Sequence, residues 1–256
     1  KRPSTHVPTF FVDTPVTQDE WPIYEAFKQH GFDALCAILP GDSIAVQTQD
    51  SKRFLYTVKD MPMSEASPWY TWKQTSSEII LEKDELVRKL RASRFGTNNE
   101  MYYYLNLTVH PSWGTALLGD ISEFGVTAEM QHPAPPSEFN PEMNIHLWAA
   151  VQGAVCPLHY DTYHNFFVCL HGRKRFRLLS PVYWNAVALF PAMHPSCRQS
   201  QVGFRGLPLA LRRNAIEVDL KAGEVLYIPP YWFHEVSNPE PSVGLNMWSD
   251  SVWQHM

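Results

Sequence analysis

The chain has 256 residues and a net charge of -5 with histidine neutral, and 45% of its residues are hydrophobic. This length can bury a sizeable core, and one domain with elaborations is favoured over two small all-β domains. The longest basic cluster, Arg173 to Arg177, lies in an otherwise apolar segment, so the charge pattern gives no support for binding DNA or RNA. No apolar stretch approaches the roughly 20 residues that span a bilayer, which predicts a soluble protein with no membrane association.

The cysteines show no spacing typical of a disulfide framework or a zinc ribbon, and no signal-like segment precedes them. They are Cys36, Cys156, Cys169 and Cys197. Reduced thiols of this kind indicate a cytoplasmic or nuclear protein. Because the chain begins at Lys1 rather than Met, an N-terminal segment or further domain is expected before it.

Helical periodicity is confined to the first half, where Asp19 to His30 and Lys83 to Ala92 are expected to be helices that cover a sheet. A Pro-rich loop is expected over His132 to Pro141. Short alternating segments between Gly and Pro turns predict strands and a jelly roll or barrel. These segments are Ser43 to Thr48, Arg53 to Val58, Tyr102 to Val109, Ile145 to Val151, Asn165 to Leu170, Arg175 to Leu179, Ala215 to Leu220, Val225 to Ile228 and Val243 to Trp248.

A His and an Asp lie two residues apart in the segment Pro157 to Asp161. Side chains alternate between the two faces of a strand, so His159 and Asp161 are expected on the same face. Together they supply two ligands of the 2-His-1-carboxylate triad, which leaves positions open on Fe(II) for a co-substrate and O2. A lone His-x-Asp is more often a chance pattern than a metal site, so a third ligand is required.

His234 is the best candidate for that ligand. The segment Gly223 to His234 reads as a turn, a buried strand and a Pro-stiffened bend that delivers one histidine inward. The alternative for His234 is a packed, hydrogen-bonded histidine in aromatic surroundings. His164 has the wrong strand parity to join the metal, and His171 precedes Gly172 in an expected turn.

Lys174 lies thirteen residues after Asp161, at the start of the strand that follows Gly172. An ammonium that points into a dry barrel needs an anion, because burying it unpaired costs several kcal/mol. The distal carboxylate of 2-oxoglutarate would supply that anion. The alternative interpretation is that Lys174 belongs to a basic cluster on the surface. This interpretation suits the neighbouring arginines at least as well as an inward orientation does.

These motifs, in this order, resemble those of the JmjC-type (cupin-like) Fe(II)- and 2-oxoglutarate-dependent oxygenases. Within that family the chain most resembles the asparaginyl hydroxylase that acts on the hypoxia-inducible transcription factor and on ankyrin repeats. The motifs are Pro157 to Asp161, Asn165-Phe166-Phe167, Gly172 to Arg175, Gly223 to His234 and Asn246-Met247-Trp248, and the closer match adds Lys52 to Tyr56, Tyr104-Leu105-Asn106 and His194 to Val202. The resemblance implies a double-stranded β-helix, with residues 1–100 a mixed α/β elaboration and residues 101–250 the catalytic core of a single domain.

The resemblance also implies a role for each matching residue. His159, Asp161 and His234 would hold iron, while Lys174 and Tyr104 would bind the distal carboxylate of 2-oxoglutarate. Asn165, Asn246 and Cys156 would flank the co-substrate. Gln199 would hold a target amide, and Trp248 and Tyr56 would also contact the substrate.

Two departures from the family pattern stand out. Cys156 replaces the usual Thr or Ser, and a thiol is a much weaker hydrogen-bond donor than a hydroxyl, which lowers the expected affinity for 2-oxoglutarate. Met256 follows soon after Trp248, so the C-terminal helices through which the asparaginyl hydroxylase dimerises have no counterpart here. The oligomeric state stays open.

The leading functional hypothesis is therefore hydroxylation of a protein side chain, with Asn as one candidate, using O2 and releasing succinate and CO2. The first alternative is an N-methyl-lysine demethylase, although the chain has no zinc-binding cysteine cluster and no recognisable histone-reading module. The second alternative is a non-catalytic metal-binding cupin module.

Overall fold

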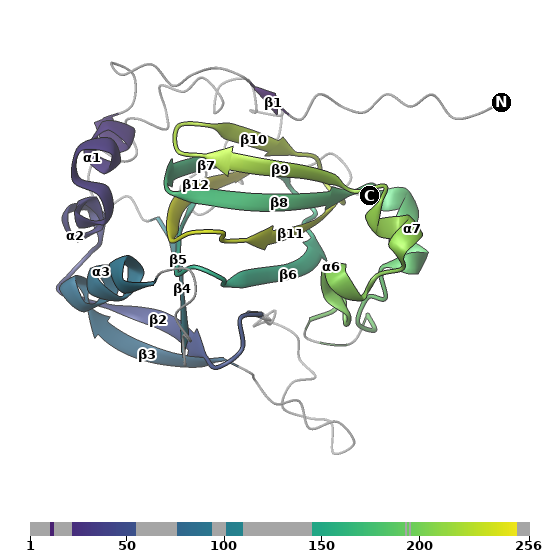
Figure 1. Ribbon diagram of the computed structural model, residues 1–256, viewed down its shortest axis with the longest axis horizontal. Coiled ribbons are helices and arrows are strands. Elements are labelled where there is room, and N and C mark those ends of the chain that lie inside the picture. The colour runs from purple at the N-terminus through teal and green to yellow at the C-terminus, as the bar shows by residue number, and fades with distance from the viewer. Residues whose placement is uncertain are drawn as a thin grey trace, which may run out of the picture.

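A computed structural model describes residues 11–12, 22–54, 76–93, 101–109, 145–192, 194 and 196–249. Antiparallel strands form two facing sheets, as expected for a jelly-roll double-stranded β-helix (Figure 1). The larger sheet has the strand order β1 (Phe11–Val12), β10 (Val225–Ile228), β7 (His164–His171), β12 (Ser242–Ser249), β5 (Ile145–Ala150), β4 (Tyr102–Thr108), β2 (Ser43–Gln49) and β3 (Ser77–Glu82). The smaller sheet has the order β6 (Val155–Tyr160), β11 (Phe233–Ser237), β8 (Arg173–Leu179) and β9 (Ile216–Lys221).

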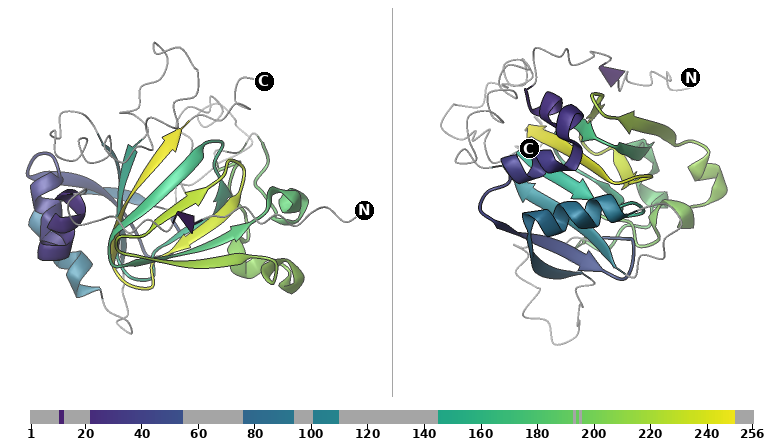
Figure 2. Two further views of the ribbon diagram at one scale, coloured as in Figure 1. Left: turned by 90° about the horizontal axis from the view of Figure 1, so that it is seen from above. Right: turned by 60° about the vertical axis from the view of Figure 1, so that its left-hand side comes forward.

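Three helices cover the outer face of the larger sheet (Figure 2). They are α1 (Pro22–His30), α2 (Ala34–Ile38) and α3 (Lys83–Ala92), and a short 3-10 helix, η1 (Gly31–Asp33), joins the first two. Their apolar side chains, such as Phe27 and Leu90, pack in one core with outward-facing strand residues such as Leu105 and Leu147. Because strand residues alternate between faces, the neighbours of these leucines point to the inner face, where the site lies.

The Gly172 turn sets the register of the β7–β8 hairpin. Gly172 has φ +73°, and a Cβ atom there would lie 2.1 Å from the carbonyl oxygen of Pro241. Only glycine fits both the left-handed conformation and this close approach of the backbone. Lys174 and Phe176 of β8 consequently point into the space between the two sheets, whereas Arg175 points away from it.

The sequence predicted most core strands to within one or two residues, and it predicted α3 at its observed bounds. The expected strand Arg53 to Val58 is wrong at its start, where Arg53 forms only an isolated bridge with Val155, and its residues 55–58 lie outside the described residues. Residues 19–21 of the expected first helix and the Pro-rich loop His132 to Pro141 also lie outside them.

The second half of the chain also contains short helices, which the sequence did not predict. The segment between β8 and β9 contains η4 (Pro181–Ala186), α6 (Gly203–Gly206) and α7 (Leu209–Arg212). These helices are too short for apolar periodicity to reveal them. Strands β2 and β3 extend the same sheet as β4, and the division of the chain at residue 100 stays a prediction. Within the described part of the chain, no helix combines the length and apolarity needed to cross a membrane.

Candidate metal and co-substrate site

The three predicted metal ligands meet at one end of the smaller sheet. Strands β6 and β11 are antiparallel neighbours, and their register places His159 directly opposite His234. Asp161 follows the last residue of β6. The Oδ1 atom of Asp161 lies 3.9 Å from Nε2 of His159, and its Oδ2 atom lies 3.5 Å from Nε2 of His234. One potential ligand atom from each residue lies within 4.8 Å of the other two, which is a spacing that a single metal ion can bridge.

Backbone carbonyls fix the orientation of both imidazoles. Nδ1 of His159 lies 2.7 Å from the carbonyl oxygen of Pro157, and Nδ1 of His234 lies 3.0 Å from that of Trp232. A carbonyl can only accept a hydrogen bond, so each Nδ1 carries the proton. Nε2 is then the nitrogen of each ring that can bind a metal, and both Nε2 atoms lie on the side of Asp161.

A chain of donors orients the carboxylate of Asp161. The indole of Trp148 donates to Oδ1 of Asn246 at 2.6 Å, and Nδ2 of Asn246 donates to Oδ1 of Asn165 at 3.2 Å. Asn165 in turn donates to Oδ2 of Asp161 at 3.3 Å. These residues lie on β5, β12 and β7, so the larger sheet positions a ligand carried by the smaller one.

The bend that leads to His234 is tied to the same carboxylate residue. Tyr231 adopts φ +66°, a left-handed conformation that costs a bulky residue free energy. Its backbone N–H donates to the carbonyl oxygen of Asp161 at 2.7 Å. This hydrogen bond holds the segment before His234 against the end of β6.

Burial and neighbouring charges set the protonation states of His159 and Asp161. Burial, together with the nearby charge of His234, lowers the pKa of His159 to about 4, so this imidazole is neutral at pH 7. For Asp161, burial alone would favour the neutral acid, but the imidazoles of His159 and His234 outweigh it and lower the pKa. The result is an ionised carboxylate beside the neutral imidazole of His159.

Lys174 points inward, as predicted, and is only 1% exposed. Its Nζ donates to Oδ1 of Asn238 at 2.9 Å, and the ring centroid of Phe167 lies 5.8 Å away. Burial lowers the pKa of Lys174 to about 8, and the described residues provide no carboxylate partner for it. A buried ammonium in this state favours an anionic ligand.

One cavity of about 430 Å³ joins the three metal ligands to Lys174. The predicted co-substrate residues Tyr104, Asn165, Asn246 and Cys156 all line it. Burial, followed by the charge of Asp161, raises the pKa of the Cys156 thiol to about 12, although Tyr104 donates a hydrogen bond to it. Cys156 is therefore a neutral thiol beside the metal ligands.

The predicted substrate residues do not meet at the cavity. Trp248 lines it, whereas Tyr56 lies outside the described residues. Gln199 is fully buried, pairs with His159 through a backbone bridge, and does not belong to the described lining. Its neighbour Arg198 lines the wall instead. The Gln199 side chain is therefore not part of the described cavity wall.

Sequence reasoning missed His146, Asn106 and Arg198, which line the outer part of the cavity. Nδ1 of His146 lies 3.2 Å from Oδ1 of Asn106, and the His146 ring lies 4.6 Å from that of Trp248. Burial lowers the pKa of His146 to about 4 despite the opposing charge of Asp161. The period-two alternation of Ile145 to Val151 was the available signal, since it places His146 and Trp148 on the inner face.

The donor set can hold a divalent metal of the first transition series. A set of two imidazoles and one carboxylate suits Fe(II) and leaves positions open for other ligands. The buried Lys174 ammonium, with Tyr104 beside it on the lining, suits the free carboxylate of a small dicarboxylic acid. The residues present therefore fit both iron and 2-oxoglutarate.

Comparison with protein-family models matches residues 11–255 to the cupin-like domain. The chain belongs to the cupin-like domain family. This cupin-like domain is 28% identical over 149 residues to JmjC domain-containing protein C of Dictyostelium discoideum, covering 50% of the chain and 35% of that protein. It is 31% identical over 111 residues to lysine-specific demethylase JMJ30 of Arabidopsis thaliana, covering 41% of the chain and 25% of that protein.

A third relative of the cupin-like domain is tRNA wybutosine-synthesizing protein 5 of Gallus gallus, at 35% identity over 104 residues. That match covers 38% of the chain and 30% of the relative. The cupin-like domain thus matches a quarter to about a third of the length of these relatives. The first of these relatives is named for a JmjC domain, and the other two are named for different activities.

Proposed function

We propose that this cupin-like domain is an Fe(II)- and 2-oxoglutarate-dependent dioxygenase. One observation carries the proposal: His159, Asp161 and His234 share a cavity with a buried Lys174 that has no carboxylate partner among the described residues. A structural metal site would need the three ligands but not the ammonium. Similarity to JmjC-domain proteins supports the same activity.

Each residue has a role in this proposal. His159, Asp161 and His234 hold iron through two Nε2 atoms and a carboxylate oxygen. Lys174 and Tyr104 bind the distal carboxylate of 2-oxoglutarate, while Asn165, Asn246 and Cys156 flank the co-substrate. When bound, iron and 2-oxoglutarate supply the chemistry that reduces O2, oxidises a substrate C–H bond and yields succinate and CO2.

The rest of the chain orients these groups. The donor chain from Trp148 through Asn246 and Asn165 keeps one lone pair of Asp161 occupied, which restricts how this carboxylate can turn. The ring centroids of Phe167 and Phe176 lie 5.1 Å apart. Both rings line the cavity with Lys174 and exclude water from its surroundings. Exclusion of water strengthens the pairing between an ammonium and a carboxylate.

The substrate we propose is a protein or peptide side chain. Hydroxylation of Asn has less support than the sequence suggested, because the Gln199 side chain is buried away from the described lining. Demethylation of N-methyl-lysine is the second candidate, and the similarity to lysine-specific demethylase JMJ30 favours it. Both reactions begin with oxidation of a C–H bond, and demethylation ends with loss of formaldehyde.

A succinate assay tests the proposed activity. Anaerobically purified, iron-loaded protein is incubated with 2-oxoglutarate and O2, and succinate and bound iron are both measured. We expect turnover and about one iron per chain in the native protein, and loss of both in His234→Ala. The matched control is His30→Ala, at an exposed histidine outside the cavity, which should keep both. Iron-loaded native protein that makes no succinate contradicts the proposal.

Mass spectrometry of peptide substrates separates the two candidate reactions. An added oxygen on an unmodified peptide marks hydroxylation, and loss of a methyl group with release of formaldehyde marks demethylation. Because one relative is named for tRNA wybutosine synthesis, tRNA belongs in the same assay as a third substrate class. Succinate formation stimulated by tRNA alone would overturn the assignment of a protein substrate.

A further inference from the structure

A second cavity lies on the opposite face of the four-stranded sheet. Alternation along β8 sends Lys174 and Phe176 into the catalytic cavity and sends Arg175 and Arg177 outward. Along β11, His234 likewise lines the catalytic cavity, and Glu235 lines the second cavity. No described residue lines both. We call the second cavity the basic cleft; its lining residues include Lys52, Arg53, Arg175, Arg177, Arg205 and Glu235.

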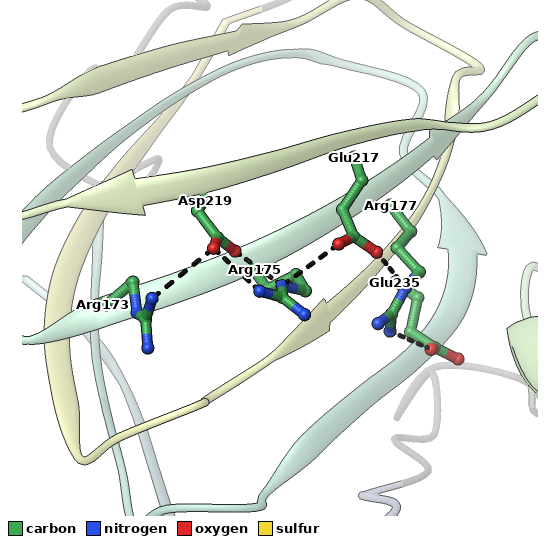
Figure 3. A network of polar contacts seen from close by, with 6 residues as sticks. All are labelled: Arg173, Arg175, Arg177, Glu217, Asp219 and Glu235. Atoms are coloured by element: carbon green, nitrogen blue, oxygen red, sulfur yellow. Dashed lines mark hydrogen bonds and ion pairs between the residues drawn. The ribbon is translucent and has the colours of Figure 1, made fainter.

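Positive charge exceeds negative charge in the basic cleft. Its described lining holds five cationic side chains and one carboxylate, that of Glu235. Figure 3 shows how Glu217 and Asp219 of β9 pair with the arginines of β8. When Glu217, Asp219 and the Arg173 that pairs with Asp219 are counted as well, three positive charges remain. That surplus suits an anionic ligand such as a phosphate monoester dianion.

Among the described residues, Lys52, Arg53 and Arg205 form no ion pair with these carboxylates, and Arg53 and Arg205 are the two guanidinium groups among them. The Nη2 atom of Arg53 is buried and has no hydrogen-bond partner among the described residues. A Cβ atom at Gly203 would lie 2.8 Å from it, so glycine at this position leaves room for the guanidinium. Arg205 is exposed on α6, two residues further along. A guanidinium held in place with unused donors is a typical partner for phosphate oxygens.

Arg177 is already engaged and helps to shape the cleft. It pairs with Glu217 and Glu235 at 2.8 and 3.4 Å, and its guanidinium lies 5.3 Å from the ring centroid of Phe204. Glu235 also accepts a hydrogen bond from the backbone N–H of Phe204 at 2.9 Å. These contacts connect α6 to the sheet. The cleft has a volume of about 520 Å³, which is in the usual range for small-molecule sites.

We propose that the basic cleft binds a phosphorylated small molecule, with its phosphate group held by Arg53 and Arg205. The buried donor of Arg53 supplies the fixed contact, and the exposed Arg205 closes over the phosphate from α6. Tyr102 and Phe204 offer apolar surface to the rest of the ligand. This site does not depend on the proposed oxygenase activity, because the four-stranded sheet separates the two cavities.

Calorimetric titration tests the site. The iron-loaded protein is titrated with adenosine 5′-monophosphate, with ribose 5-phosphate and, as the control without phosphate, with adenosine. Saturating 2-oxoglutarate is present so that Lys174 is already paired. We expect at least one of the phosphorylated probes to bind and adenosine not to bind. In Arg53→Gln/Arg205→Gln the affinity should fall about tenfold to a hundredfold.

Two further variants keep the result interpretable. Arg213→Gln removes one charge from an exposed arginine outside the cleft and should bind as the native protein does. Arg205→Gln alone changes an exposed side chain, so it tests the site even if the double variant fails to fold. Binding of neither phosphorylated probe, equal binding of adenosine, or native affinity in folded cleft variants would each overturn the proposal. Succinate formation in Arg205→Gln should stay at the native rate, so failure of this site is distinct from failure of the catalytic proposal.

Discussion

Lys174 combines a functional requirement with a cost to stability. Its pKa of about 8 lies below the usual value of 10.5 because the ammonium is buried. We expect Lys174→Met to abolish succinate formation and to raise the free energy of unfolding at pH 7. The gain should be about 1 to 3 kcal/mol, since a shift of one pKa unit corresponds to about 1.4 kcal/mol. Urea denaturation of the protein without co-substrate measures it.

The pH dependence identifies the cause of that gain. A buried lysine with a lowered pKa destabilises the fold fully below the folded pKa, and the effect disappears above the unfolded pKa. The difference between Lys174→Met and the native protein should therefore shrink as the pH rises from about 8 to 10.5. The exposed Lys221→Met serves as the matched control and should show no such trend. A gain that persists at pH 10.5 would point to packing instead of charge.

Cys156 limits the affinity for 2-oxoglutarate in our proposal. The thiol lines the cavity as a weak donor and stays protonated because its pKa is raised to about 12. We expect Cys156→Thr to lower the KM for 2-oxoglutarate about fivefold to tenfold, since an added hydrogen bond contributes about 1 kcal/mol. Cys156→Ala, which removes the donor, should not lower it. An equal KM in the native protein and the Thr variant would show that another group fills this role.

At the residue scale, the sequence predicted the residues whose position follows from strand alternation. His159 and Asp161 share a face because they are two residues apart, and Lys174 points inward for the same reason. The carbonyl partners of the two imidazoles were not predictable, because they depend on local backbone bends. The role expected for Gln199 stays a prediction: its side chain is buried and does not line the described cavity, and a matching position in the chain does not determine which way a side chain turns.

Residues on three neighbouring strands of the larger sheet together orient the carboxylate of Asp161, a proposed metal ligand. Trp148→Phe removes the indole donor to Asn246 and leaves a buried amide oxygen without that partner. We expect metal affinity to fall about tenfold to a hundredfold, as is typical when a group that orients a ligand is lost. Metal titration monitored by fluorescence or calorimetry measures this affinity. Trp184→Phe, at a tryptophan that is 62% exposed, is the control and should bind metal normally. Unchanged affinity in Trp148→Phe would show that Asp161 is oriented without this chain.

At the element scale, the core strands were predictable because apolar and polar residues alternate over enough positions to exceed chance. Strand β3 was missed because its residues are mostly exposed, so the sequence carries little alternation there. Helix α2 spans only five residues. The pairing of distant strands, such as β6 with β11, was inferred from the resemblance and not from any local signal.

Acid should destabilise the whole molecule through its buried histidines. The pKa values of His146 and His159 are lowered to about 4, mainly by burial. As the pH falls from 6.5 to 4, the unfolded chain takes up protons that the folded chain does not, so the free energy of unfolding falls. We expect a loss of about 2 to 5 kcal/mol for the metal-free protein, measured by urea denaturation. His146→Gln should show a smaller loss, and an identical pH profile would contradict this assignment.

Strand β8 is shared by two chemically different compartments, since its even-numbered side chains face one and its odd-numbered side chains face the other. Inserting a single residue after Gly172 would turn Lys174 outward and carry an arginine toward the proposed iron ligands. An insertion of one residue in this strand therefore alters both compartments at once, whereas a point substitution can alter one compartment alone. Any lengthening of β8 that preserves both must come in steps of two residues.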